Sequence, residues 1–146
     1  MRGVRIGVDV GKVRIGVAAS DPDGLLATPV RTVARAGGTG GADLAEITEV
    51  VRTYGAVEVV VGLPVTLGGQ ERQAAVEVRQ YADRLARMVA PIPVRLADER
   101  LSTVVATRRL SERGVRGKRR RTVVDQAAAV EILQGWLDAH RRKPDA

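Results

Sequence analysis

The stretch VRIGVDV at residues 4–10 decides the fold class of this chain. Apolar residues alternate with other residues along it, and a period of two is typical of a β-strand. Gly11 and Lys12 predict a tight turn, and residues 13–19 predict a second strand that runs back beside the first. The chain is therefore expected to open with an antiparallel pair of strands.

The third extended run covers residues 25–33 and follows the turn sequence DPDG at 21–24. Pro29 lies inside this run. Because a proline cannot donate a hydrogen bond to a β-ladder, we expect this strand at an edge of the sheet. The glycine-rich stretch at 37–41 then predicts a mobile loop.

Beyond this loop, helical and strand-like patterns alternate. Apolar residues at helical spacing predict four helices, over 43–54, 70–89, 103–112 and 122–137. Short apolar runs predict two strands, over 57–61 and 94–97, of which the first is apolar enough to be covered on both faces. In the clearest helix, the apolar face consists of Ala74, Val78, Tyr81, Leu85 and Met88.

The order of these elements, β-β-β-α-β-α-β-α-α, predicts an α/β fold. Strand–helix–strand crossovers join parallel neighbours, so we expect a mixed five-stranded sheet with helices on both faces. The 146 residues are the size of one domain, and no linker or repeat divides them. We assign residues 1–140 to a single domain and residues 141–146 to a disordered basic tail.

Composition excludes several classes of protein. The chain has no Cys and one His, which leaves no disulfide framework, no thiolate chemistry and no ligand set for zinc. No run of about eighteen apolar residues and no secretory signal is visible in the sequence. We therefore expect a cytoplasmic protein without membrane contact.

The excess of positive charge lies in one short segment. The chain has 24 Lys and Arg residues against 17 Asp and Glu residues, a formal net charge of +7. Residues 108–121 contain eight basic residues against one acid, Glu112, and account for the whole excess. Gly114 and Gly117 interrupt helical propensity there, so we expect a flexible loop. Such a cluster is typical of a site for a polyanion, although a solvated basic loop explains it equally well.

Carboxylates stand at three positions that the expected fold would bring together. Asp9 ends the first strand, Glu99 follows Asp98 at the end of the last strand, and Asp125 opens the last helix. In open α/β sheets, functional groups gather beyond the carboxyl ends of the parallel strands. The small residues after Asp125 would let its helix approach the sheet closely and carry the carboxylate towards Asp9.

Three clustered carboxylates indicate a metal site. Hard cations such as Mg²⁺ and Mn²⁺ prefer oxygen ligands, and two of them about 3.5–4 Å apart can activate a water and stabilise a leaving oxygen on phosphorus. Each acid also fits a structural role: Asp9 in a turn, Glu99 at an exposed strand end, Asp125 in the first turn of a helix. The basic segment favours the metal site, because acids without a cation would repel the same polyanion.

The junction after the strand at 57–61 is a weaker candidate. Gly62, Gly68 and Gly69 could let backbone amides and a helix N-terminus hold a phosphate, but an ordinary crossover turn explains these glycines better. Trp136 lies at helical spacing with neighbouring leucines and is expected in the core.

Several motifs together resemble the YqgF/RuvX family of bacterial ribonuclease H-like proteins. The resemblance spans nearly the whole chain and is carried by IGVDVG at 6–11, RIGVA at 14–18, VGLP at 61–64, DERLST at 98–103 and VDQAAAV at 124–130. The motifs are specific in combination, whereas Asp-x-Gly alone is weak. Members are described as Holliday junction resolvases and as nucleases that mature the precursor of 16S ribosomal RNA.

The resemblance implies a ribonuclease H-like fold with strand order 3-2-1-4-5 and the first three strands antiparallel. It also implies that Asp9, Glu99 and Asp125 form the catalytic metal site, with Mg²⁺ or Mn²⁺ as cofactor. Many members carry a Lys where this chain has Val13. Lys12 and Arg14 flank that position and could supply a similar basic contact.

We therefore expect a metal-dependent nuclease that hydrolyses phosphodiester bonds in structured nucleic acid. Backbone phosphates would be held by eight basic residues, Lys12, Arg14, Arg100, Arg116, Lys118, Arg119, Arg120 and Arg121. The expected substrate is the ends of precursor 16S ribosomal RNA, and the alternative is a four-way DNA junction cut by a homodimer. A third interpretation is a non-catalytic nucleic-acid-binding factor of ribosome precursor particles. An actin-type or sugar-kinase ATPase is excluded, since it needs two such domains.

Overall fold

The computed structural model describes residues 2–36, 41–65, 68, 71–98 and 118–141. These residues contain one five-stranded sheet in the order β3-β2-β1-β4-β5. The strands are β1 (Arg5–Val10), β2 (Arg14–Ser20), β3 (Ala27–Ala34), β4 (Glu58–Leu63) and β5 (Val94–Asp98). β1, β2 and β3 pair antiparallel, β4 runs parallel to β1, and β5 runs parallel to β4. The expected strand order and antiparallel meander are confirmed.

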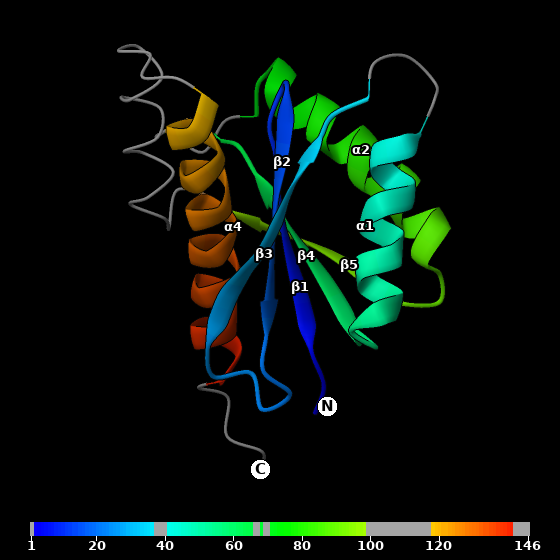
Figure 1. Cartoon of the computed structure of the whole chain (residues 1–146), viewed down its shortest axis with the longest axis vertical. Coiled ribbons are helices and arrows are strands. Elements are labelled where there is room, and N and C mark those ends of the chain that lie inside the picture. The colour runs from blue at the N-terminus through cyan, green and yellow to red at the C-terminus, as the bar shows by residue number, and fades with distance from the viewer. Residues whose placement is uncertain (1, 37–40, 66–67, 69–70, 99–117, 142–146) are drawn as a thin grey trace.

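Helices cover both faces of the sheet (Figure 1). α1 (Ala42–Thr53) and α2 (Gln73–Val89) lie on one face, and the long α4 (Lys118–Arg141) lies on the other. None of these described helices combines the length and the apolar character needed to cross a membrane. The helix expected over 103–112 and residues 37–40 of the glycine-rich loop lie outside the described residues.

The turn between β2 and β3 depends on Asp21. Its carboxylate accepts hydrogen bonds of 2.8 Å from the backbone N–H groups of Leu26 and Leu25, and one of 3.1 Å from that of Asp23. These bonds, that from Leu26 foremost, lower the pKa of the Asp21 carboxyl below its ordinary value. β3 then follows as an edge strand, as Pro29 predicts.

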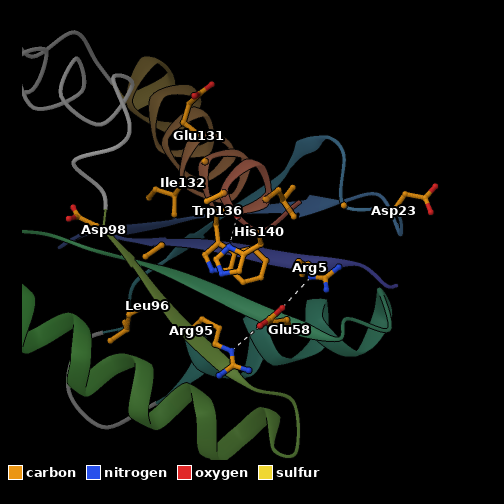
Figure 2. A pocket seen from close by; sticks show the side chains of 15 residues that line it. Arg5, Asp23, Glu58, Arg95, Leu96, Asp98, Glu131, Ile132, Trp136 and His140 are labelled. Atoms are coloured by element: carbon orange, nitrogen blue, oxygen red, sulfur yellow. Dashed lines mark hydrogen bonds and ion pairs between the residues drawn. The ribbon is translucent and has the colours of Figure 1, made fainter. Parts of the chain in front are cut away.

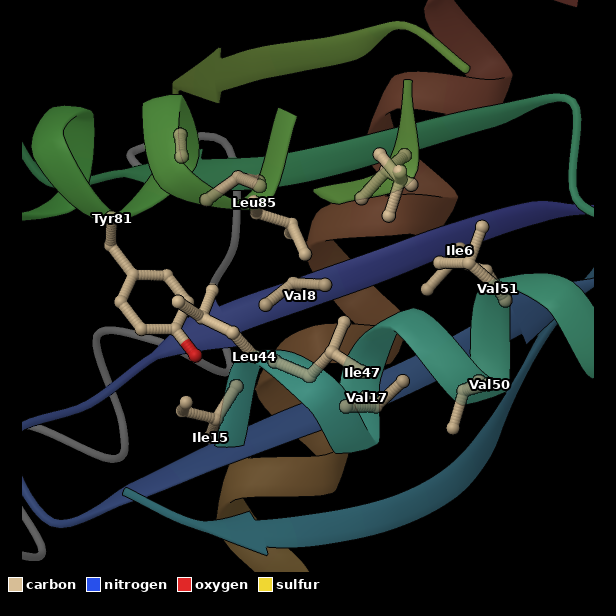
Figure 3. Packing of buried hydrophobic residues seen from close by; sticks show 14 of the residues in the cluster. Ile6, Val8, Ile15, Val17, Leu44, Ile47, Val50, Val51, Tyr81 and Leu85 are labelled. Atoms are coloured by element: carbon tan, nitrogen blue, oxygen red, sulfur yellow. The ribbon is translucent and has the colours of Figure 1, made fainter. Parts of the chain in front are cut away.

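The larger core lies between the sheet and the pair α1 and α2. Ile6 and Val8 of β1 project from this face of the sheet, together with Ile15 and Val17 of β2 (Figure 3). All four are fully buried, and they pack against apolar side chains of both helices. The period-two pattern of the first strands therefore predicts this core correctly.

The buried face of α2 differs in part from the predicted one. Val78, Tyr81 and Leu85 are buried as expected, whereas Ala74 and Met88 are exposed. The buried stripe repeats at intervals of three and four residues and consists of Ala75, Val78, Ala82, Leu85 and Val89, with Tyr81 beside it. The buried face is therefore rotated about the helix axis relative to the predicted one, towards Ala75, Ala82 and Val89.

α4 packs directly against the backbone of β1 and β4. A Cβ atom added at Gly7 would lie 2.7 Å from the Cβ of Leu133, and one added at Gly62 would lie 2.5 Å from Cδ1 of Ile132. Both separations are well below normal carbon–carbon contact, so a side chain at Gly7 would push against α4 itself and one at Gly62 would displace the end of Ile132. The small residues Ala128 and Ala129 that follow Asp125 are also fully buried against this face. The predicted close approach of this helix to the sheet is confirmed.

α4 begins earlier and ends later than its apolar pattern predicts. Lys118–Arg121 is helical, contrary to the loop expected there, and Arg141 belongs to the helix and not to a tail. Lys and Arg are good helix formers, but a turn composed only of basic residues shows no apolar periodicity. Residues 108–117 and 142–146 lie outside the described part of the chain.

Gly7→Ala is expected to destabilise the protein, because its new Cβ meets a Cβ atom of Leu133, which rotation of the leucine side chain cannot move away. Overpacking of this kind costs about 1–3 kcal/mol of unfolding free energy. The matched control is Gly135→Ala in α4, where an added Cβ meets nothing within 4 Å. This control should stabilise the helix by up to about 1 kcal/mol. Urea unfolding measures both, and a Gly7→Ala variant as stable as the parent would contradict the packing described here.

Candidate active site

Asp9 lies near the carboxyl end of β1 and faces α4. Successive side chains of a strand point to opposite faces, and Ile6 and Val8 enter the core on the side of α1 and α2. Gly7, whose missing side chain makes room for α4, and Asp9 therefore share the other face. Asp9 is only 2% exposed. Carboxylates are seldom buried this deeply, so Asp9 is a candidate functional residue and not an exposed turn residue.

A row of paired residues connects Asp9 with α4. Asp9 pairs with Gly16 of β2, and Gly16 pairs with Thr32 of β3. Oγ1 of Thr32 accepts a 3.0 Å hydrogen bond from Nε2 of Gln126 in α4. Gln126 follows Asp125, so the bond holds this turn of α4 over the row that contains Asp9. Sequence reasoning missed the contact, because 94 positions separate its residues and no local pattern links them.

The packing along α4 supports the same alignment. The space beside Gly7 is filled by atoms of Ala129 and Leu133, and α4 runs antiparallel to β1 (Figure 1). From Gly7 to Asp9 the strand advances by about 6.8 Å, and from Ala129 back to Asp125 the helix advances by about 6 Å. The main chain at Asp125 is therefore level with Asp9, while the side chain of Asp125 is outside what the structure describes.

The carboxyl ends of β1, β4 and β5 meet at one edge of the sheet. Val8 is level with Val61 of β4, and Leu63 at the end of β4 is level with Asp98 at the end of β5. Asp98 is half-buried, and Glu99, the expected ligand that follows it, lies outside the described residues. Among the side chains that the structure does describe, no three potential metal ligands cluster. Of the three expected ligands, the structure therefore describes Asp9 with its side chain and Asp125 by its main chain.

Some of the expected phosphate-binding residues also lie at this edge. Lys12 is exposed in the turn that follows β1, and Arg14 begins β2. Lys118–Arg121 forms the first turn of α4, which lies beyond the carboxyl end of β1 because the two elements are antiparallel (Figure 1). Arg100 and Arg116 lie outside the described residues.

Gly62, one of the three glycines of the candidate phosphate loop, has a packing role in the structure. It lies inside β4, where it pairs with Ala97, and its missing side chain accommodates Ile132 of α4. Gly68 is exposed, and Gly69 lies outside the described residues. β4 extends beyond the predicted strand, since Gly62 and Leu63 still pair with Ala97 and Asp98 of β5.

A groove of about 780 Å³ lies beside α4 on the same face of the sheet (Figure 2). Asp98 lines one part of it, and Trp136 and His140 line another, their rings stacked with centroids 3.8 Å apart. Trp136 is expected in the core. It is partly buried, packs against the second apolar cluster, which α4 forms with its own face of the sheet, and also lines this groove.

The charges in this groove do not favour a polyanion. Arg5 and Arg95 both pair with Glu58, with Nε to carboxylate distances of 3.2 and 2.9 Å. The remaining Asp and Glu residues that line the groove, Asp23, Asp98 and Glu131, leave acidic residues in excess. An excess of acidic residues repels a phosphate backbone.

Comparisons with known proteins match nearly the whole chain. The model of the family described as "RuvX: Holliday junction resolvase" matches residues 3–139. A Rhodococcus opacus protein named "Putative pre-16S rRNA nuclease" is 58% identical over 147 residues, which cover 99% of this chain and 83% of that protein. A Frankia casuarinae protein of the same name is 60% identical over 138 residues, which cover 94% of this chain and 68% of that protein.

Solved structures confirm the ribonuclease H-like fold. The structure of T. thermophilus RuvC in complex with a Holliday junction substrate matches with a TM-score of 0.59 and 16% identity, covering 96% of each chain. A second Thermus thermophilus RuvC structure matches with a TM-score of 0.55 and 18% identity, covering 94% of this chain and 96% of that one. At these identities the likeness concerns the fold alone. The family match over residues 3–139, together with the close relatives, shows that this chain belongs to the RuvX Holliday junction resolvase family.

Proposed function

We propose that this chain is a metal-dependent nuclease that hydrolyses phosphodiester bonds in structured nucleic acid, with the ends of precursor 16S ribosomal RNA as its substrate. The observation that carries the proposal is the position of Asp9, a buried carboxylate that faces α4 level with the main chain of Asp125. The family and the names of the relatives support nuclease activity and this RNA substrate.

Asp9, Glu99 and Asp125 would hold Mg²⁺ or Mn²⁺. Carboxylate oxygens are the ligands that these cations prefer, and Asp9 places one in a buried position that faces α4. The burial of Asp9 also keeps bulk water away, so a cation would act there in a low dielectric. When bound, such ions activate a water for attack on phosphorus and stabilise the leaving oxygen.

The basic residues at the same edge would hold the substrate. Lys12 in the turn after β1 and the first turn of α4 would contact backbone phosphates and offset the repulsion between phosphate and the acidic residues. Contacts of this kind position a nucleic acid without reading its sequence. The recognised feature would then be the shape of the RNA.

A four-way DNA junction is the second candidate substrate, favoured by the family description. Its resolution requires two active sites on a symmetric dimer that cut opposing strands. Light scattering with and without a synthetic junction distinguishes the two substrates, since a chain that stays monomeric on the junction would not make paired cuts.

Asp9→Asn is expected to abolish cleavage and preserve the fold, because it removes a ligand charge and keeps the side-chain shape. Glu99→Gln and Asp125→Asn should have the same effect. Binding of nucleic acid without Mg²⁺ should persist or strengthen in all three variants, because each loses an acid that repels phosphate. The control is Asp83→Asn, an exposed acid of α2 that should cleave like the parent. All variants are assayed side by side on precursor 16S RNA and on a four-way junction. If one of the three site variants cleaves at the parental rate, its residue is not a ligand.

Mg²⁺ or Mn²⁺ is expected to restore cleavage after treatment with a chelator, while Zn²⁺ alone is expected to fail. The site offers carboxylates, and the chain has no Cys that would favour Zn²⁺. The measurement is the initial cleavage rate as each ion is added back. Activity with Zn²⁺ and with neither of the other ions would contradict the assignment.

Replacing Lys118–Arg121 by four alanines tests the basic edge. Alanine is the best helix former, so the first turn of α4 should persist while up to four phosphate contacts are lost. On duplex DNA the slope of log affinity against log salt should become shallower by up to about 3.6, at ~0.9 per contact. Binding is titrated in Ca²⁺ to prevent turnover, with Arg52→Ala/Arg87→Ala on the opposite side of the sheet as control. An unchanged slope would place the nucleic acid elsewhere.

A further inference from the structure

The turn between β1 and β2 connects Asp9 to Lys12, and its shape is tightly constrained. The N–H of Gly11 donates a 2.9 Å hydrogen bond to the carbonyl of Arg14. A Cβ added at Gly11 would lie 2.5 Å from the same carbonyl oxygen, so only glycine fits. The main chain that leaves Asp9 therefore depends on how this turn is held.

Arg35, just beyond the end of β3, holds the turn on both sides of Lys12. Its backbone N–H donates a 2.8 Å hydrogen bond to the carbonyl of Val13, and its Nη1 donates a 3.0 Å hydrogen bond to the carbonyl of Gly11. A guanidinium donor makes a stronger hydrogen bond to a carbonyl than a neutral donor does. Arg35 thus links the third strand to the turn that follows Asp9.

The side chain of Arg35 is itself held by the helices on the other face. Its guanidinium carbon lies 5.4 Å from the ring centroid of Tyr81, which α2 projects into the larger core (Figure 3). Burial, and then the Asp43 carboxylate, raise the pKa of Tyr81, which keeps its ring neutral. Arg84 of α2 lies over the same ring, also at 5.4 Å. Packing on an aromatic face leaves the guanidinium few alternative orientations.

We infer that Arg35 is a positioning residue for the candidate metal site, acting through the Gly11 carbonyl on the main chain of Asp9 and Lys12. The inference rests on the proposed function. Arg35 would not touch metal or substrate. It would connect the well-packed larger core to the turn beside the site and so restrict the conformations of that turn. Supporting residues of this kind are needed to hold ligands in productive geometry.

Arg35→Met tests this inference, since it keeps the length of the side chain and removes its donors. Arg84→Met is the matched control, because it removes a guanidinium from the same ring and leaves both bonds to the turn. Binding of Mn²⁺ to the protein without nucleic acid is measured by electron paramagnetic resonance. We expect the dissociation constant to rise about 10-fold in Arg35→Met and to stay at the parental value in Arg84→Met. The Mg²⁺ concentration for half-maximal cleavage should rise by a similar factor, with kcat at saturating Mg²⁺ nearly retained.

If the parent binds Mn²⁺ and cleaves while Arg35→Met matches Arg84→Met in both measurements, the inference is wrong and the proposed function stands. If the parent neither binds Mn²⁺ nor cleaves, the proposed function fails and the inference fails with it. Should Arg35→Met not fold, Arg35→Lys and Arg84→Lys replace the pair. A lysine keeps the charge but cannot reproduce the planar guanidinium contact, so we expect a smaller rise of the Mn²⁺ dissociation constant in Arg35→Lys than in Arg35→Met. Equal dissociation constants for the two Lys variants would overturn the inference.

Discussion

Two glycines set how close α4 comes to the sheet, and the geometry of the acidic site depends on that distance. At Gly7 and Gly62 the helix meets bare backbone, because Leu133 and Ile132 occupy the space that side chains would need. A helix held further away would carry Asp125 away from Asp9. The hydrogen bond from Gln126 to Thr32 then fixes the helix along the sheet as well as above it. The contact between α4 and the sheet therefore both packs the core and sets the distance between Asp125 and Asp9.

Most of the fold could be predicted from the sequence, because its signals are local. Alternation in residues 4–10, Pro29 in an edge strand and the apolar run of β4 each reflect an environment that a strand imposes on its own residues. The start of α4 could not be predicted, because its residues carry no such local signal. Lys118–Arg121 forms a helical turn without an apolar face, so periodicity carries no information about it.

The candidate site could be predicted only in outline. A carboxylate at a strand end, as at Asp9, is visible in the sequence, and the general rule on the carboxyl ends of parallel strands places it correctly. The contacts that orient the site were not visible. Thr32 contacts α4, and Arg35 contacts Gly11, through hydrogen bonds between segments that are distant in the sequence. Gly62, which suggested a phosphate loop, packs against α4. Such roles exist only once the chain is folded.

The first turn of α4 combines two unfavourable electrostatic effects. Lys118–Arg121 places four cations at the positive end of the helix macrodipole, and this turn contains no acidic residue. Self-repulsion therefore opposes the helix at its own beginning, and dissolved anions relieve it. A phosphate chain bound at this end would neutralise these charges and favour the helical turn. Asp125 lies about two turns further in, beyond the first turn to which this end effect is confined.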